Sequence, residues 1–520
     1  MPSIDILPAH TLTFLNARLV GRHAALTFTV AVQDGVVRSI EEDGAGAGAS
    51  SGSEGAPTVD LKGSYLAPSV IDNHTHFSSW ALASQRIDLY TAESASEVLS
   101  RVSSWLLTQP PASDDDDGQY LVGQRMRVGT WPDLALMTRL ALDALAPQRP
   151  LVLFFAGFHS LCANSVALER LGSESEGHSG VLEEADCFKS WVKLNQVPEE
   201  VLDRAVDQAA RKAAARGITQ IVDLEMAFNL STWARRVQQR GTDCLRVRCG
   251  MYEAHLPDAL ERGWKTGDVL PETKGLVEVG PFKVITDGSL GSRTACCHHA
   301  YPGEPTNFGH FEYPPPTLKS MLETATAGGM NLAVHALGDK AISLTLETFA
   351  SLAAPPLPDS TIEHAQLLLP SDIPLFKQLG LVASIQPVHM ADDRELAEMF
   401  WPDRTARAFA FRDMVDAGIP IRMGSDAPVA LIDPWDAMAV AVSRVGKDQS
   451  HLPPWHPEQT ISNLQAWTAS TWNGRVGFEV GEQADLIVID RDPLLASAEE
   501  LRETKVLGTM LGGRWTHSAL

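Results

Sequence analysis

Two histidines separated by one residue, His74 and His76, stand at the end of an apolar segment that reads as a β-strand. In an extended chain residues i and i+2 point to the same side, so both imidazoles can reach one metal ion. A single histidine in a strand is more often a hydrogen-bonded structural residue than a ligand. The spacing of the two histidines is therefore what favours metal binding.

Four more polar residues lie within or at the end of other apolar, strand-like segments. They are Lys283, His335, His364 and Asp426. Each alone has a structural alternative: Lys283 could pair with Asp287, and Asp426 could cap a helix that begins before Pro428. Those alternatives do not explain why five separate segments end in this way. The combination predicts one metal site built from four histidines, a carboxylate and a lysine.

Elements that would bring these residues together are visible in the hydrophobic pattern. Short apolar segments alternate with helical stretches such as 199–216 and 317–328, a pattern typical of parallel strands covered by helices. Eight such segments predict a (β/α)8 TIM-like barrel, whose active site lies at the carboxyl ends of the strands. They are 66–73, 217–224, 245–251, 282–286, 332–335, 361–364, 382–386 and 421–426.

Two regions do not fit the barrel. Residues 78–215 form a long insertion after the first strand. Residues 1–65 and 475–520 are both rich in strand-like segments, with turns at Asp34-Gly35 and Gly512-Gly513, so they are expected to pair as one small β-sandwich. The predicted domains are this sandwich and a barrel over 66–474 that includes the insertion.

Composition excludes several classes of function. The 520 residues include 42 Lys and Arg against 65 Asp and Glu, a net charge of −23, which argues against nucleic acid or an anionic membrane as partner. No apolar run is long enough to span a bilayer, and the first residues lack the pattern of a secretory signal. Six cysteines without a C-x-x-C pair are typical of reduced thiols in a cytoplasmic enzyme.

Six blocks of sequence in a fixed order resemble the amidohydrolase superfamily, in particular its amidohydrolase-3 or YtcJ-like branch, which includes N-substituted formamide deformylases. The blocks are LAPSVIDNHTHF (66–77), FKVITDGSLGSRTA (282–295), LAVHALGDKAI (332–342), TIEHAQ (361–366), SIQPVHM (384–390) and GSDAP (424–428). FHSLCANSVAL (158–168) and ADLIVIDRDP (484–493) are also similar. The resemblance extends from about residue 12 to residue 515.

This resemblance implies a metal-dependent hydrolase with two metal ions. His74, His76 and Asp426 would hold one ion, and His335 and His364 the other. Lys283, carboxylated on its amine by CO2, would bridge the two. Two zinc ions per chain are expected, although imidazole and carboxylate ligands also suit manganese or iron.

The implied reaction is hydrolysis of a non-peptide C–N bond in a linear or N-substituted small-molecule amide. A metal-bound hydroxide would attack the carbonyl carbon, and Asp426 would act as general base and then protonate the leaving nitrogen. Two alternatives remain open. One is a deaminase or a cyclic amide or lactone hydrolase on the same site, although related single-metal deaminases lack the lysine. The other is a non-catalytic scaffold, although such proteins usually lose their ligands.

Substrate contacts are expected from loops at the barrel mouth and in the insertion. The candidates are His159, Asn164, Arg293, Gln386 and His389. Each has a structural alternative, such as a helix cap for Asn164 and an ion pair with Asp287 for Arg293. A homodimer is a reasonable expectation for the assembly.

Overall fold

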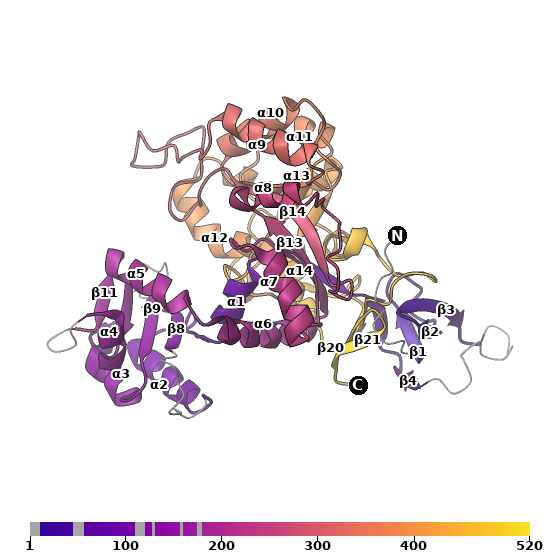
Figure 1. The fold of residues 1–520 in the computed structure, drawn as a ribbon, viewed down its shortest axis with the longest axis horizontal. Helices are drawn as coiled ribbons and strands as arrows, with labels where there is room; N and C mark the ends of the chain where they lie inside the picture. The colour runs from indigo at the N-terminus through magenta and orange to yellow at the C-terminus, as the bar shows by residue number, and fades with distance from the viewer. Residues whose placement is uncertain (1–10, 45–56, 110–119, 127–130, 156–159, 174–178) are drawn as a thin grey trace. The chain divides into compact units, whose positions relative to one another are not determined.

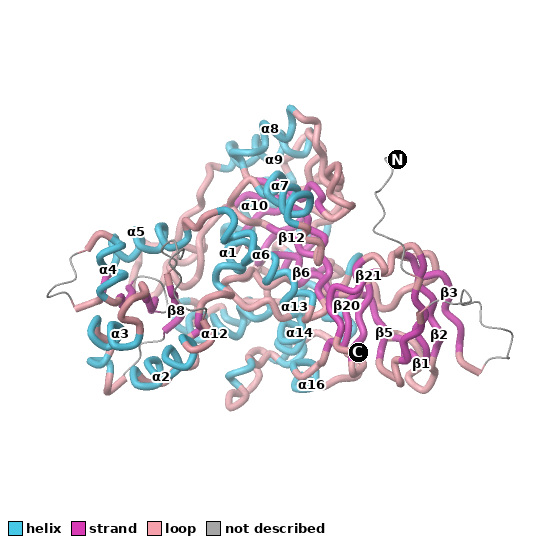
Figure 2. Tube along the Cα trace, turned by 60° about the horizontal axis from the view of Figure 1, so that its bottom comes forward, coloured by secondary structure: helices cyan, strands magenta, loops and turns pink. Residues whose placement is uncertain are grey.

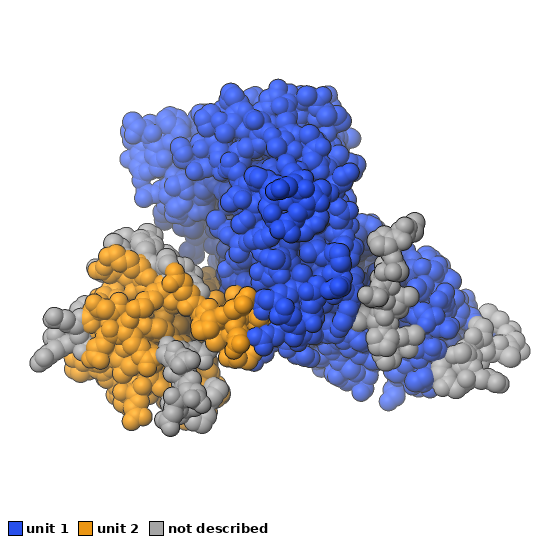
Figure 3. Space-filling model, viewed as in Figure 1, with its two compact units in different colours: residues 1–79, 207–520 blue, residues 80–206 orange. Residues whose placement is uncertain are grey.

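The computed structural model describes residues 11–44, 57–109, 120–126, 131–155, 160–173 and 179–520. The chain divides into two compact units, residues 1–79 with 207–520 and residues 80–206 (Figure 3). The second unit falls within the predicted insertion, 78–215. The second unit ends at residue 206, inside helix α6 (Glu199–Ala214), so this helix belongs partly to each unit.

Eight parallel strands of the first unit form the predicted barrel. In order around it they are β6 (Val70–Thr75), β12 (Ile218–Asp223), β13 (Arg246–Met251), β14 (Val277–Ile285), β15 (Leu332–Ala336), β16 (Thr361–His364), β17 (Val382–Ile385) and β18 (Ile421–Met423). Each of the eight predicted segments overlaps one of them, and the bounds differ most at β6 and β14, so the TIM-like barrel is confirmed. The first and last strands are joined by backbone hydrogen bonds from the Asp426 N–H to the His74 carbonyl (2.7 Å) and from the His76 N–H to the Ala427 carbonyl (2.8 Å).

Helices lie between successive strands along the chain, and Figure 1 labels several of them beside β13 and β14. Every residue of β16 and β17 is buried, because neither face of a parallel strand inside a barrel is exposed to water. The main connecting helices after β12 are α7 (Asn229–Arg235), α8 (Leu256–Glu261), α9 (Pro315–Ala327), α10 (Asp339–Ala350), α11 (Ile373–Gln378), α12 (Pro387–Phe400), α13 (Phe411–Asp416), α14 (Pro434–Ser443) and α15 (Asn463–Ala469).

The first predicted strand, 66–73, is in fact two strands. β5 (Tyr65–Pro68) belongs to the sheet formed by the chain ends, and β6 belongs to the barrel. The chain passes from one to the other at Ser69, whose N–H donates to the Asp485 carbonyl and whose hydroxyl bonds Thr219. Pro68 and the polar Ser69 interrupt the apolar run at this point, a signal of a strand end that the single predicted segment passed over.

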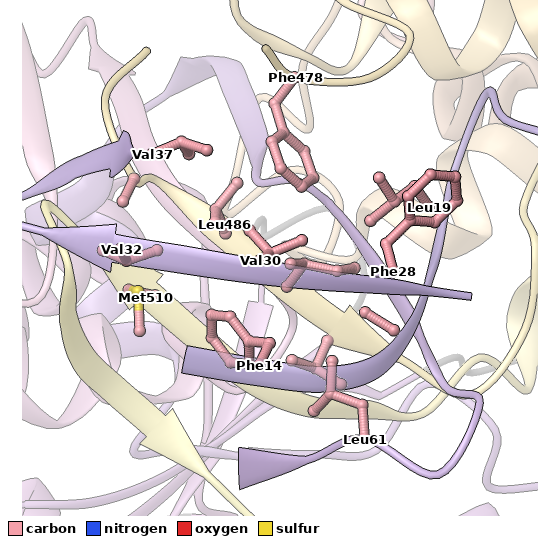
Figure 4. Packing of buried hydrophobic residues seen from close by; sticks show 14 of the residues in the cluster. Phe14, Leu19, Phe28, Val30, Val32, Val37, Leu61, Phe478, Leu486 and Met510 are labelled. Atoms are coloured by element: carbon pink, nitrogen blue, oxygen red, sulfur yellow. The ribbon is translucent and has the colours of Figure 1, made fainter. Parts of the chain in front are cut away.

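Both ends of the chain build the second part of this unit, as predicted. Its strands are β1 (Leu12–Leu19), β2 (Phe28–Gln33), β3 (Val36–Glu42), β4 (Thr58–Asp60), β5, β19 (Leu486–Ile489), β20 (Val506–Leu511) and β21 (Arg514–Ser518). β1 bends at Asn16 (φ +52°), pairs with β4 before the bend, and pairs with β5 after it. The strands from the two ends of the chain enclose an apolar core that includes Phe14, Val30, Leu486 and Met510 (Figure 4).

The second unit has its own five-stranded sheet, with the order β11-β10-β9-β8-β7. The strands are β7 (Ile87–Asp88), β8 (Leu121–Met126), β9 (Leu151–Phe155), β10 (Ser160–Ala163) and β11 (Val181–Glu183), with helices α2 (Ala95–Leu106), α3 (Arg139–Leu145), α4 (Ser165–Leu171) and α5 (Glu184–Asn195) (Figure 2). Among the described residues of the whole chain, no helix combines the length and the apolar character needed to cross a membrane.

The closure of the barrel depends on Gly424, which follows β18. A Cβ at this position would lie 2.6 Å from the backbone nitrogen of His74 and 2.7 Å from its Cβ. Real side chains do not approach this closely, so glycine is required where the loop after β18 passes β6.

We expect Gly424→Ala to destabilise the protein by about 1–3 kcal/mol, because the loop must move away from β6. Urea unfolding measures the change. Gly291→Ala is the matched control, since its Cβ would meet only Leu396 Cδ1 at 3.6 Å, and should stay within about 0.5 kcal/mol of the parent. Equal effects of the two substitutions would contradict this account of Gly424.

Candidate metal centre

The six residues predicted to bind metal all lie at the carboxyl end of the barrel. His74 is in β6 and His76 is one residue beyond it, while Lys283, His335 and His364 lie in β14, β15 and β16. Asp426 follows β18 by three residues. His74, Lys283, His364 and Asp426 are buried, and His76 and His335 are partly exposed.

One carboxylate lies at the centre of this group. Oδ1 of Asp426 is 3.3 Å from Nε2 of His74 and 3.2 Å from Nε2 of His76. Ligand atoms of His74, His364 and Asp426 all lie within 4.8 Å of one another. The ring of His335 is 4.5 Å from the ring of His364, centroid to centroid. The barrel therefore brings the four histidines and the carboxylate together.

Backbone conformation contributes to this convergence. His364 and Asp426 both adopt positive φ, +71° and +55°, a conformation that non-glycine residues rarely take and that often accompanies functional sites. In a regular strand, neighbouring side chains point to opposite faces. Here both Glu363 and His364 reach His74: Glu363 by a hydrogen bond and His364 by a ring contact of 5.0 Å.

The protonation states are those that suit metal binding. Burial would raise the pKa of Asp426, but His74, His76 and His364 together lower it well below its usual value. Burial lowers the pKa of His74, and lowers that of His364 further still. These directions favour an ionised carboxylate and neutral rings, the forms that bind metal.

The pKa values of His76 and Lys283 are shifted in opposite directions. Burial would lower the pKa of His76, but its hydrogen bond with Asp426 and the charges of Asp426 and Glu225 raise it overall. Burial lowers the pKa of Lys283, although Glu363 and Asp426 oppose this. A lowered pKa increases the fraction of neutral amine, the form of lysine that can react with CO2.

The residues present fit divalent metal ions. Imidazole nitrogens and a carboxylate are common ligands of zinc, manganese and iron. In the described part of the chain, buried Nδ1 of His364 has no hydrogen-bond partner, which is unusual for a buried polar atom. The expected ligand sets placed His74 and Asp426 on one ion and His364 on the other. In the structure, ligand atoms of these three residues instead form one compact group.

Three buried carboxylates support the histidines, a role that the sequence analysis gave to none of them. Glu363 Oε2 lies 2.5 Å from Nδ1 of His74. Asp287 Oδ1 lies 3.3 Å from Nε2 of His335, and Asp287 also accepts backbone N–H groups of residues 296, 337 and 338. Asp72 accepts the N–H groups of His74 and Ser425. The only available signal was their position beside the predicted ligands.

Two of the predicted substrate contacts lie at the metal centre. His389, in the first turn of α12, has Nε2 3.9 Å from Oδ2 of Asp426, and its ring stacks on His364 at 6.1 Å. Gln386 stands at the N-cap position of the same helix without capping it through its side chain, and its Nε2 lies 3.4 Å from Nδ1 of His74. Both stay candidates for contact with substrate.

The other predicted contacts are placed differently. Asn164 is fully buried and caps α4; it accepts from the N–H groups of Leu151 and Ala167 and donates to two carbonyls, so the helix-cap alternative describes it. Arg293 pairs with Glu304 and not with Asp287. His159 lies outside the described residues.

A model of the amidohydrolase family matches residues 57–517. The chain belongs to this family. It is 24% identical to the putative amidohydrolase YtcJ of Bacillus subtilis, with 89% of this chain and 91% of that protein covered. It is 26% identical to the N-substituted formamide deformylase of Arthrobacter pascens, with 88% and 89% covered. These relatives place it on the predicted YtcJ-like branch.

Two further comparisons extend this result. The protein LONG AFTER FAR-RED 3 of Arabidopsis thaliana is 27% identical, with 89% of this chain and 84% of that protein covered. Among solved structures, an uncharacterized metal-dependent hydrolase from Pyrococcus horikoshii is 21% identical, with a TM-score of 0.74 and 94% of this chain and 99% of that one covered. The fold is therefore that of an amidohydrolase barrel, and family membership makes the chain a hydrolase.

Zinc binding should weaken as the pH falls from about 8 to about 6, because a proton competes with the metal at His76, whose pKa is raised. Zinc titration by calorimetry in two buffers of different ionisation enthalpy measures the affinity and the protons released. His310→Ala, at an exposed ion pair with Glu312, is the control and should keep the parent's pH dependence. An affinity that is constant over this range, without proton release, would contradict the prediction.

Proposed function

We propose that this protein is a metal-dependent amidohydrolase that cleaves a non-peptide C–N bond of a linear or N-substituted small-molecule amide. The observation that carries the proposal is the Asp426 carboxylate held between His74 and His76, within 4.8 Å of a ligand atom of His364. The similarity to an N-substituted formamide deformylase supports the choice of bond.

The proposed ligands are His74, His76 and Asp426 on one side and His335 and His364 on the other, with Lys283 between the two. When bound, two divalent ions would polarise the carbonyl group and lower the pKa of the attacking water. Buried Lys283, with its lowered pKa, would add CO2 at Nζ and lose a proton. The resulting carbamate would supply negative charge between the two cations.

Asp426 is the proposed proton carrier. Its Oδ1 faces His74 and His76, whereas Oδ2 faces His389 at 3.9 Å, so Oδ2 is the oxygen better placed to accept a proton from water. The same oxygen would then deliver the proton to the leaving nitrogen, which is a poor leaving group without it. His389 and Gln386 would orient the substrate beside this carboxylate.

Metal content per chain tests the proposal most directly. The protein is purified with bicarbonate and without chelators, and elemental mass spectrometry compares the parent with Lys283→Ala. About two ions in the parent and a clear loss in the variant support the bridged centre. Hydrolysis of N-substituted formamides and linear amides is then measured against cyclic amides, lactones and aromatic amines.

Other results would favour other functions. One ion in both proteins would make Lys283 structural and favour a deaminase, for which the compact trio of His74, His364 and Asp426 offers ligands. No bound metal, even after reconstitution, would contradict both enzymatic functions.

Asp426→Asn should lower kcat by about 10²–10⁴-fold, because an amide cannot carry the proton. The far-UV circular dichroism spectrum and the melting temperature should stay close to those of the parent. Metal content is measured on the same sample, since Asp426 is also a proposed ligand. Asp416→Asn, at an exposed ion pair with Arg412, is the matched control and should keep full activity. An active, metal-loaded Asp426→Asn would exclude this role.

A further inference from the structure

We propose that Glu363 is a positioning residue that holds the ring of His74 with Nε2 directed into the metal centre. This inference rests on the proposed function, because it assigns a role to a residue behind a proposed ligand. Glu363 comes from β16 and His74 from β6, and β17 and β18 separate these strands around the barrel. The contact is therefore made across the barrel interior, at 2.5 Å between Oε2 and Nδ1.

The geometry selects one tautomer of His74. A carboxylate oxygen only accepts hydrogen bonds, so Nδ1 must donate the proton and Nε2 keeps its lone pair. Nε2 is also the atom that lies 3.3 Å from Asp426 Oδ1. A neighbouring carboxylate that fixes the ring and increases the basicity of the binding nitrogen is a general feature of metal-binding histidines.

Gln386 offers His74 the opposite tautomer. Its Nε2 lies 3.4 Å from Nδ1 of His74 and is a hydrogen-bond donor. If Gln386 were the main partner, Nδ1 would accept and Nε2 would carry the proton, which blocks metal binding. The shorter, charge-assisted contact with Glu363 is the stronger of the two, so the carboxylate decides the tautomer.

Glu363 is itself held in place. It is 2% exposed, and the Thr361 hydroxyl donates to its second oxygen. Glu363 also lines a cavity inside the barrel, together with Asn73, Ser384 and Asp359. Asp359 pairs with Arg422 at 2.5 Å and is half exposed. A carboxylate at the same cavity, paired with an arginine, provides a matched control.

Zinc affinity tests the proposal without any substrate. Metal-free parent, Glu363→Ala, Glu363→Gln and Asp359→Asn are titrated with Zn²⁺ in competition with a chromophoric chelator. We expect Glu363→Ala to weaken one of the two binding steps about 10–100-fold. Glu363→Gln, which keeps an acceptor oxygen, should weaken it less, and Asp359→Asn should match the parent.

Stability readouts separate positioning from folding. The metal-free Glu363→Gln variant should have the parent's circular dichroism spectrum and melting temperature, while its Zn²⁺ affinity and its Co²⁺ absorption spectrum change. If Glu363→Ala does not fold, this isosteric variant carries the test. The proposal is overturned if Glu363→Gln keeps the parent's Zn²⁺ affinity and Co²⁺ spectrum and Glu363→Ala, where it folds, keeps them too. An equal loss of Zn²⁺ affinity in Asp359→Asn would also overturn it, because the affinity would then depend on negative charge at the cavity and not on the contact between Glu363 and His74.

The failure of this inference is distinguishable from failure of the proposed function. A parent that binds two ions but hydrolyses none of the amides contradicts the proposed function, while the effect of Glu363 on zinc affinity still stands. A parent that binds no zinc overturns both, and this result is obtained before any variant is measured.

Discussion

The closure of the barrel between β6 and β18 is the constraint on which the candidate site depends. The backbone bonds that join these strands come from the residues that carry chemistry, since the Asp426 N–H donates to His74 and the His76 N–H donates to Ala427. Gly424 permits the close approach because it has no side chain. The same few bonds therefore complete the sheet and set Asp426 against the two histidines, so that site geometry and fold closure cannot vary independently.

Burial of charge around this closure is compensated locally. Asp72 accepts hydrogen bonds from two backbone N–H groups. Asp287 accepts three and lies beside His335. Glu363 accepts hydrogen bonds from the His74 ring and the Thr361 hydroxyl. Isolated carboxylates in such surroundings would be costly, and each here has donors directed at it. The result is a polar interior whose side chains have few alternative positions, which suits a site that must hold its ligands in place.

Much of this arrangement follows from patterns of residues. Eight apolar segments located the barrel strands, and the i, i+2 spacing placed His74 and His76 on one side because strands alternate with period two. The same reasoning missed Glu363, since alternation would direct it away from His364. In the structure His364 has a positive φ, and both side chains contact His74. The division at Ser69 was also missed, although Pro68 and Ser69 interrupt the apolar run there, because short apolar segments on both sides read as one strand. The partner of Arg293 depended on a loop whose path no periodic pattern describes.

The sheet shared by the chain ends has a consequence for the order in which the protein is made. β5 pairs with β1 on one side and with β19 on the other, and β19 is synthesised only after all eight barrel strands. Until then β5 presents an unpaired edge, a feature that promotes association between chains. Thr509 of β20 also donates its hydroxyl to the Ala214 carbonyl at the end of α6. Strands β19 and β20, made after the barrel strands, thus cover the exposed edge of β5 and attach the sheet to the barrel.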